Sequence, residues 1–171
     1  GGVIVSSASI IEKIYPFMKN AGPSLSPFNA WVLSKSLETL AIRMDRHCSN
    51  ALKIAQWLES QPEVLMVKYP FLKSNFGYDI AKSQMKAGGG LISFELKGGK
   101  QAGIKMIDSR KMISLSANLG DTRTIITHPA SSTHSKLSAE DRASAGITEG
   151  LVRMSVGLEH VDDIIDDIIL K

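Results

Sequence analysis

Hydrophobic side chains recur every three or four residues from Leu37 to Leu58, which is the spacing of one face of an α-helix. The same spacing predicts a helix over residues 9–19, which Pro16 should end or kink. A further helix should begin after Ser26, because serine is a good N-cap and a proline follows it. The first 60 residues are therefore expected to be mainly helical.

After residue 63 the pattern changes to the alternation of apolar and polar positions that is typical of strands. Extended segments are predicted at residues 64–69, 91–96, 113–118, 123–127 and 151–156. Short helices are predicted at residues 78–86 and 101–107 and after Ser138. In the last helix the apolar side chains should point inward and the acidic ones outward: Val161, Ile164, Ile165, Ile168 and Ile169 against Asp162, Asp163, Asp166 and Asp167.

This order of elements predicts the α+β class, with a small sheet covered by helices on one face and preceded by long connecting helices. We expect three parts, residues 1–36, a long connecting helix at 37–63, and a C-terminal domain at 64–171. The chain opens on an apolar, strand-like run, residues 3–5, without an initiator methionine. We therefore expect a piece of a larger protein; a tag remnant on a complete domain is the alternative.

Composition narrows the class of protein. The 171 residues are 43% hydrophobic and 22% charged, which is ordinary for a globular domain and excludes intrinsic disorder. No apolar run reaches the ~20 residues that span a bilayer, so no membrane association is expected. A net charge of +3 is too small to predict nucleic-acid binding. With one cysteine and no signal peptide, we expect a cytoplasmic protein without a disulfide framework.

Histidine and cysteine provide few candidates for chemistry. His47 and Cys48 are adjacent in a predicted helix and point about 100° apart, so Cys48 is interpreted as a core residue. His128 and His134 flank a polar loop and lack a third metal ligand at a typical spacing. Hydrogen bonds within the loop or the wall of a pocket are the favoured interpretations. No metal site is expected, and the C-terminal aspartates are interpreted as a solvated helix face.

Arg153 is the strongest single candidate. It alternates with Val152 and Met154, so it should face away from the buried side of its strand and into an open cleft. Its sequence neighbours Leu151 and Ser155 carry no charge. A guanidinium in such surroundings suits a bidentate contact with a carboxylate. A surface arginine or a partner in an ion pair is the alternative.

Two long motifs are distinctive: NLGDTRTIITHPASSTH at residues 118–134 and GITEGLVRMSVGLE at residues 146–159. Together with residues 20–31 and 37–40, they resemble the C-terminal half of the Cys/Met-metabolism pyridoxal-phosphate enzymes. The resemblance covers essentially the whole chain. It implies the C-terminal domain of a PLP-dependent fold type I transferase, with residues 1–36 as a remnant of the large cofactor-binding domain and residues 64–171 as the substrate-binding domain.

The resemblance also implies site residues. Arg153 would bind the α-carboxylate of the substrate, Asn118 would line the cofactor and substrate region, and Thr124 would lie near the carboxylate end. The sequence of residues 117–121 is similar to that of the O-succinylhomoserine sulfhydrylase branch, whose substrate is an activated homoserine. Cystathionine γ-synthase and methionine γ-lyase are the alternative branches. A homo-oligomer is implied in each case.

The chain departs from the family pattern at the residue that holds the cofactor. The family's Schiff-base lysine lies in a Ser-Ala-Thr-Lys type motif just before a strand that resembles residues 1–5, so it would fall outside this sequence. We therefore expect no catalytic residue and no covalently bound pyridoxal phosphate here, and the cofactor-binding residues stay unknown. One reading is the C-terminal fragment of a γ-replacement enzyme of methionine and cysteine biosynthesis. The other is an inactive, self-associating remnant.

Overall fold

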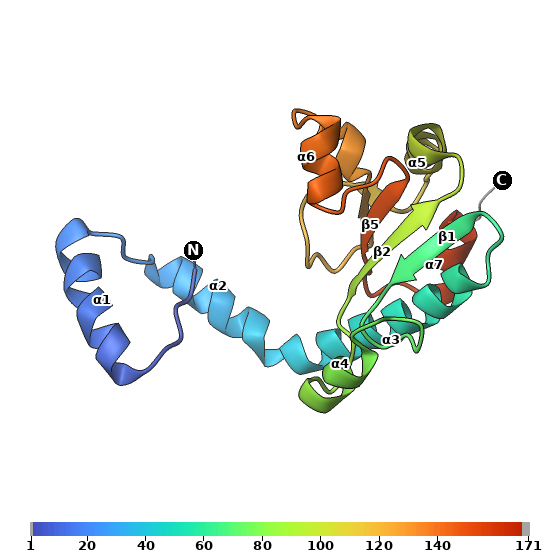
Figure 1. The fold of residues 1–171 in the computed structure, drawn as a ribbon. Helices are drawn as coiled ribbons and strands as arrows, with labels where there is room; N and C mark the ends of the chain where they lie inside the picture. The colour runs from blue at the N-terminus through green and yellow to red at the C-terminus, as the bar shows by residue number, and fades with distance from the viewer. Residues whose placement is uncertain (1, 169–171) are drawn as a thin grey trace. The chain divides into compact units, whose positions relative to one another are not determined.

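The computed structural model describes residues 2–168 and divides the chain into two compact units, the first ending at Ala41 and the second beginning at Ile42 (Figure 1). The first unit contains helices α1 (Ala8–Ala21) and α2 (Pro27–Glu38). Among its described residues none is buried, and Ile14 alone is half-buried. The first unit therefore has no hydrophobic core of its own.

Local signals set the helix ends in the first unit. The hydroxyl of Ser26 accepts a hydrogen bond from the backbone N–H of Asn29, and Pro27 opens α2, as predicted. The helix α1 continues through Pro16 and ends at Gly22, whose φ of 79° is left-handed. A proline removes one helical hydrogen bond, and here this loss does not end the helix. The run at residues 3–5 is not a strand, which corrects the sequence-based expectation.

The second unit contains most of α3 and the elements that follow it. Their bounds are α3 (Leu40–Glu59), β1 (Val64–Lys68), α4 (Tyr78–Gln84), β2 (Leu91–Leu96), α5 (Gly99–Asp108), β3 (Ser114–Leu115), β4 (Ile125–Thr127), the 3-10 helix η1 (Pro129–Ser131), α6 (Ala139–Ser144), β5 (Leu151–Ser155) and α7 (Val161–Ile168). The predicted elements are all present. The two extended segments around residue 120 are shorter than predicted, because a loop occupies residues 116–124.

The five strands form one mixed sheet in the order β1-β2-β5-β4-β3. All neighbouring pairs are antiparallel except β3 and β4, which are parallel. The central pair aligns Ile92 with Met154 and Phe94 with Val152, and these four side chains are fully buried. Paired residues point to the same side of a sheet, so this register creates one apolar face.

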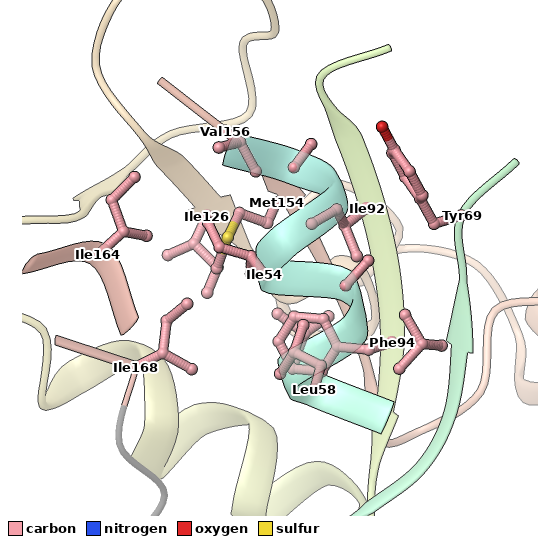
Figure 2. Close-up of a cluster of buried hydrophobic side chains, with 14 of the residues drawn as sticks. Ile54, Leu58, Tyr69, Ile92, Phe94, Ile126, Met154, Val156, Ile164 and Ile168 are labelled. Atoms are coloured by element: carbon pink, nitrogen blue, oxygen red, sulfur yellow. The ribbon is translucent and has the colours of Figure 1, made fainter. Parts of the chain in front are cut away.

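The helices α3 and α7 cover that apolar face, and α5 contributes to the same core (Figure 2). In Figure 2, Ile54 and Leu58 of α3 and Ile164 of α7 point toward Phe94 and its neighbours in the sheet. The cluster confirms the predicted α+β fold with helices on one face. Burying side chains of this size stabilises a fold by about 1.5–3 kcal/mol each.

Two predictions about helix faces need correction. In α3 the expected apolar stripe is buried from Ala51 onward, whereas Leu40 and Met44 are exposed, because they precede the part of the helix that packs on the sheet. In α7, Asp167 is not merely solvated: its carboxylate accepts hydrogen bonds from the backbone N–H groups of residues 111–113. Ile169 lies outside the described residues. No helix in residues 2–168 is long and apolar enough to cross a membrane.

Candidate functional site

Strand β5 places Arg153 on the face of the sheet opposite to α3 and α7. Val152 and Met154 are buried on the helix side, and Arg153 between them is half-buried. Arg153 is aligned with Ser93 of β2 and with Thr127 of β4, so three polar side chains form a row across this face. Its orientation is as the alternation predicts.

Two surface grooves of the second unit are lined by residues other than Arg153. One groove is lined by residues of α5 and α7, and another runs along β1. Arg153 lines neither of them. It lies on the sheet face opposite to α3 and α7, where its neighbours Thr127 and Ser155 are buried.

The guanidinium of Arg153 is held on one side and unpartnered on another. Nη2 donates a hydrogen bond of 2.8 Å to the carbonyl oxygen of Ala117. Nε is buried and has no hydrogen-bond partner, and Arg153 forms no ion pair with a residue in the described part of the chain. A buried donor without a partner costs about 1–3 kcal/mol. A carboxylate is the group that would satisfy it best.

The loop at residues 116–124 lies beside Arg153. Asn118, one of the predicted site residues, is exposed in this loop, and its backbone N–H bonds to the hydroxyl of Ser116. The backbone N–H of Gly120 donates to the hydroxyl of Ser155, at 3.0 Å. The structure therefore brings the Asn118 segment to the end of β5, next to Arg153.

Thr124, the third predicted site residue, is fully buried at the far end of this loop. Its hydroxyl donates to the carboxylate of Glu159 at 2.9 Å and accepts from the backbone N–H of Gly157 at 2.9 Å. Its own backbone N–H donates to the same carboxylate at 2.6 Å. The hydroxyl is thus engaged by protein groups on both sides, which suits a residue that positions the loop.

Three polar side chains of α3 hold the segment that follows β5. Nδ1 of His47 lies 2.6 Å from the carbonyl oxygen of Val156. Asn50 donates to the carbonyl groups of Gly157 and Glu159, and Arg46 also donates to that of Glu159. Sequence reasoning missed this function. The signal that was available is weak: residues 46, 47 and 50 are polar side chains that border the apolar stripe of α3.

The two histidines flanking the 128–134 loop make local hydrogen bonds. His128 is buried, and its ring nitrogens lie 2.8 Å from the hydroxyl of Ser131 and 2.8 Å from the carbonyl oxygen of Glu149. His134 lies 2.8 Å from the hydroxyl of Thr133. Within residues 2–168 no group of three or more metal-ligating side chains is found. Cys48 is half-buried and is a free cysteine.

Charges near the loop alter the ionisation of one carboxyl group. The backbone N–H of Arg123, followed by its guanidinium, lowers the pKa of the half-buried Asp121 below its usual value. The pKa of Arg123 is raised in turn, first by its hydrogen bond to Asp121. Because both side chains are accessible to solvent, this pair contributes little to stability. The hydrogen bond from the Arg123 backbone N–H to the Asp121 carboxylate closes a local turn in the loop.

The described residues suit a substrate carboxylate better than a covalently held cofactor. A lysine that forms an imine needs a lowered pKa, which burial or a neighbouring cation provides. Every lysine in the described part of the chain is exposed. The unpartnered guanidinium of Arg153, in contrast, fits an anionic carboxyl group. We therefore derive no reaction step through pyridoxal phosphate from the residues present.

Comparison with known proteins identifies the family. The family model of the Cys/Met metabolism PLP-dependent enzymes matches residues 1–170. The chain is 46% identical to O-succinylhomoserine sulfhydrylase of Pseudomonas aeruginosa over 164 residues, which are 96% of this chain and 41% of that protein. It is 50% identical to L-methionine gamma-lyase of Porphyromonas gingivalis over 169 residues, which are 98% of this chain and 42% of that protein.

Solved structures show the same fold. Cystathionine gamma-lyase of Lactobacillus plantarum, solved in complex with L-serine, matches with a TM-score of 0.87 and 35% identity over 96% of this chain and 43% of that one. A structure from Campylobacter jejuni, described as an O-acetylhomoserine (thiol)-lyase and containing a pyridoxyl-lysine, matches with a TM-score of 0.86 and 40% identity over 96% and 39%.

The matched part is a limited share of each relative: the chain spans about two fifths of the length of the curated relatives named above. The neighbours with solved structures are PLP-dependent fold type I enzymes. The α+β arrangement described above is therefore a part of that fold. The family match over residues 1–170, and the identities over almost the whole chain, then lead to one conclusion. The chain belongs to the family of Cys/Met metabolism PLP-dependent enzymes.

Proposed function

We propose that this chain is the substrate-binding C-terminal part of an O-succinylhomoserine sulfhydrylase-like enzyme. The complete enzyme would replace the succinyloxy substituent at the γ-carbon of an activated homoserine with a sulfur nucleophile, releasing succinate, in methionine and cysteine biosynthesis. The observation that carries the proposal is the half-buried Arg153, which lies on the sheet face opposite to α3 and α7, contacts the Asn118 loop through Ala117 and forms no ion pair with a described residue. The similarity to the Pseudomonas aeruginosa sulfhydrylase supports the substrate class.

Arg153 is proposed to bind the α-carboxylate of the substrate. The hydrogen bond from Nη2 to Ala117 fixes the plane of the guanidinium, and the N–H groups that this bond leaves accessible would donate to the incoming carboxylate. Such a contact fixes the position of the substrate Cα relative to the rest of the enzyme. When bound, pyridoxal phosphate supplies an electron sink for the chemistry at that carbon.

Asn118 and Thr124 are proposed to act at the same end of the substrate. Asn118 is exposed on the loop that Arg153 contacts through Ala117, so its side chain would line the cofactor and substrate region. Thr124 is proposed to contribute indirectly, by holding the base of that loop. The complete protein is proposed to be a cytoplasmic homo-oligomer, and we propose no nucleic-acid or membrane partner.

Two alternatives have specific support. The 50% identity to L-methionine gamma-lyase favours elimination at the γ-carbon as the alternative reaction, and cystathionine γ-synthase is the other related branch. An inactive, self-associating remnant is supported by the first unit, because large apolar side chains such as Phe17 and Phe28 are each 69% exposed. A lysine-dependent absorbance band on addition of pyridoxal phosphate to this chain would exclude the remnant.

A chimera tests the proposed function. This chain would replace the matching C-terminal part of the Pseudomonas aeruginosa sulfhydrylase, and homocysteine formation from O-succinyl-L-homoserine and sulfide would be measured. We expect activity, because 46% identity over nearly the whole chain preserves the fold. A chimera that binds pyridoxal phosphate as its parent does, yet forms no homocysteine and releases α-ketobutyrate from methionine, would instead support the γ-lyase.

A further inference from the structure

Glu159 lies just after β5 and reaches across to the start of β4. Its two carboxylate oxygens accept hydrogen bonds from the backbone N–H of Thr124, at 2.6 Å, and from the hydroxyl of Thr124, at 2.9 Å. The two residues are 35 positions apart in the sequence. Charge-assisted hydrogen bonds of this kind are about twice as strong as neutral ones. The contact therefore adds a charge-assisted link between two segments that the 2.8 Å backbone hydrogen bond from Leu158 to the carbonyl oxygen of Thr122 also joins.

The backbone of Glu159 is fixed independently of its side chain. Its carbonyl oxygen accepts from Asn50 at 2.9 Å and from Arg46 at 3.1 Å, both on α3. The carbonyl oxygen of Gly157 accepts from Asn50 as well, at 3.0 Å. Because α3 packs on the core of the second unit, the carboxylate projects from a rigid support. It can therefore impose a position on Thr124.

The space around this contact is closed. Gly157 lies against both partners, and a Cβ added there would overlap the Glu159 carboxylate and the backbone nitrogen of Thr124. The backbone N–H of Gly157 donates to the hydroxyl of Thr124, which completes a ring of three hydrogen bonds. Any side chain at position 157 would exclude this arrangement, so the contact requires a glycine there.

The held residue ends the loop that contacts Arg153. This loop is anchored at Ala117 by Arg153, at Gly120 by Ser155, at Thr122 by the backbone N–H of Leu158, and at Thr124 by Glu159. These anchors come from β5 and from the segment after it. Loss of the Glu159 contact would leave Thr124 held by its backbone bond from Ser114, so the loop would loosen without being released, and the Ala117 carbonyl would be less firmly placed against the guanidinium.

We propose that Glu159 is a positioning residue for the carboxylate site: by holding Thr124, it fixes the loop at residues 116–124 and so the orientation of the Arg153 guanidinium. The contact between Glu159 and Thr124 is observed in the structure. Its importance for substrate binding rests on the proposed function. Glu159 does not contact the substrate. It determines how well the guanidinium of Arg153 is presented.

The test uses NMR on the isotope-labelled 171-residue chain with Glu159→Gln. The variant keeps the size of the side chain and loses its charge. We expect the Thr124 amide to exchange about tenfold faster or more, because a charge-assisted hydrogen bond is lost. The Nε–H signal of Arg153 should shift and broaden. The amides of Phe94 and Met154 in the core should keep their exchange rates within about twofold.

Two further variants separate positioning from general destabilisation. Glu149→Gln is the matched control, because Glu149 is exposed and its carboxylate pairs with Arg142 outside this loop. It should leave the Arg153 signal unchanged. Thr124→Ser retains the hydroxyl and should also retain the signal, whereas Thr124→Val should reproduce Glu159→Gln.

The proposal is overturned if Glu159→Gln leaves both the Thr124 exchange rate and the Arg153 Nε–H signal as in the wild type. It is also overturned if the core amides exchange as fast as Thr124, since the effect would then be global unfolding. Neither readout requires enzyme activity. An inactive chimera would remove the proposed function and leave this result standing, so the two failures are distinguishable.

Discussion

The guanidinium of Arg153 and the carbonyl oxygen of Ala117, 2.8 Å apart, join the middle of β5 to the beginning of the loop that ends at Thr124. The bond uses Nη2 and leaves the buried Nε without a partner. A side chain whose only function is structural would be expected to have all its buried donors paired. Arg110 Nη1 and Arg142 Nε are also buried without a partner, so what distinguishes Arg153 is its contact with the loop that contains Asn118.

Replacing Arg153 by methionine should have little effect on folding. Arg153→Met removes one hydrogen bond, and it also removes a buried N–H that has no partner. These contributions oppose each other, so we expect the free energy of unfolding to stay within about 1 kcal/mol of the wild type. Urea denaturation of the 171-residue chain measures it. A loss of about 3 kcal/mol would assign Arg153 to the scaffold, as expected for a broken buried charge pair.

Gly157→Ala should destabilise the chain by about 1–3 kcal/mol, the usual cost of forcing an extra carbon into a packed site. The added Cβ would overlap the Glu159 carboxylate and the backbone of Thr124. Gly77→Ala is the control, because its Cβ would lie 3.6 Å from its nearest neighbour, Nδ2 of Asn75, which is an ordinary contact. Thermal unfolding of both variants compares them directly. Equal melting temperatures would mean that the 157 site is loosely packed.

Asp167 should make stability depend on pH. Burial raises the pKa of its carboxyl group. Hydrogen bonds from the backbone N–H groups of Ile113, Lys111 and Met112 together lower this pKa by more than burial raises it, so the net pKa is below the usual value. A lowered folded-state pKa contributes stability above the unfolded pKa of about 3.9, and this contribution is lost as the pH falls through the folded pKa.

We expect Asp167→Asn to cost roughly 1 kcal/mol at pH 7, as for the loss of a capping carboxylate. The difference from the wild type should shrink as the pH falls below about 4. Urea denaturation at a series of pH values measures this change. Asp163→Asn, an exposed position in the same helix, should show no such dependence. A penalty for Asp167→Asn that is constant down to pH 2 would contradict the linkage.

The isolated chain should self-associate. In the first unit Phe17, Phe28 and Trp31 are 69%, 69% and 58% exposed, and such apolar surface normally marks an interface. Replacing all three by serine should move the chain toward a monomer in light-scattering chromatography. Phe76→Ser is the control, because this ring is also fully exposed but lies in the second unit. A monomeric wild-type chain at micromolar concentration would refute the prediction.

The strands of the sheet could be predicted from sequence wherever alternation extends over several residues. The segment Leu91–Leu96 was predicted with its observed bounds, because Ile92, Phe94 and Leu96 alternate and all three are buried. The short strand β3 was overestimated, since its pairing with β4 ends where the 116–124 loop turns toward β5. Local pattern contains no information about where a partner strand stops.

The site could be predicted only in part. The phase of Arg153 against Val152 and Met154 gave the correct face of the sheet, because strand alternation is a local property. Glu159 could not be found in this way, since its partner Thr124 is 35 residues away and both are polar residues in loops. The unpartnered Nε of Arg153 is likewise a property of the folded surroundings and has no signature in the sequence.

The most direct test of the account is the Michaelis constant of the chimeric sulfhydrylase with Arg153→Ala. Truncating one partner of a close charge pair costs about 2–5 kcal/mol, so KM for O-succinyl-L-homoserine should rise by about 30-fold or more. Lys53→Ala, on the exposed side of α3, should leave KM unchanged. A KM for Arg153→Ala equal to that of the unmodified chimera would contradict the claim that Arg153 binds the substrate carboxylate.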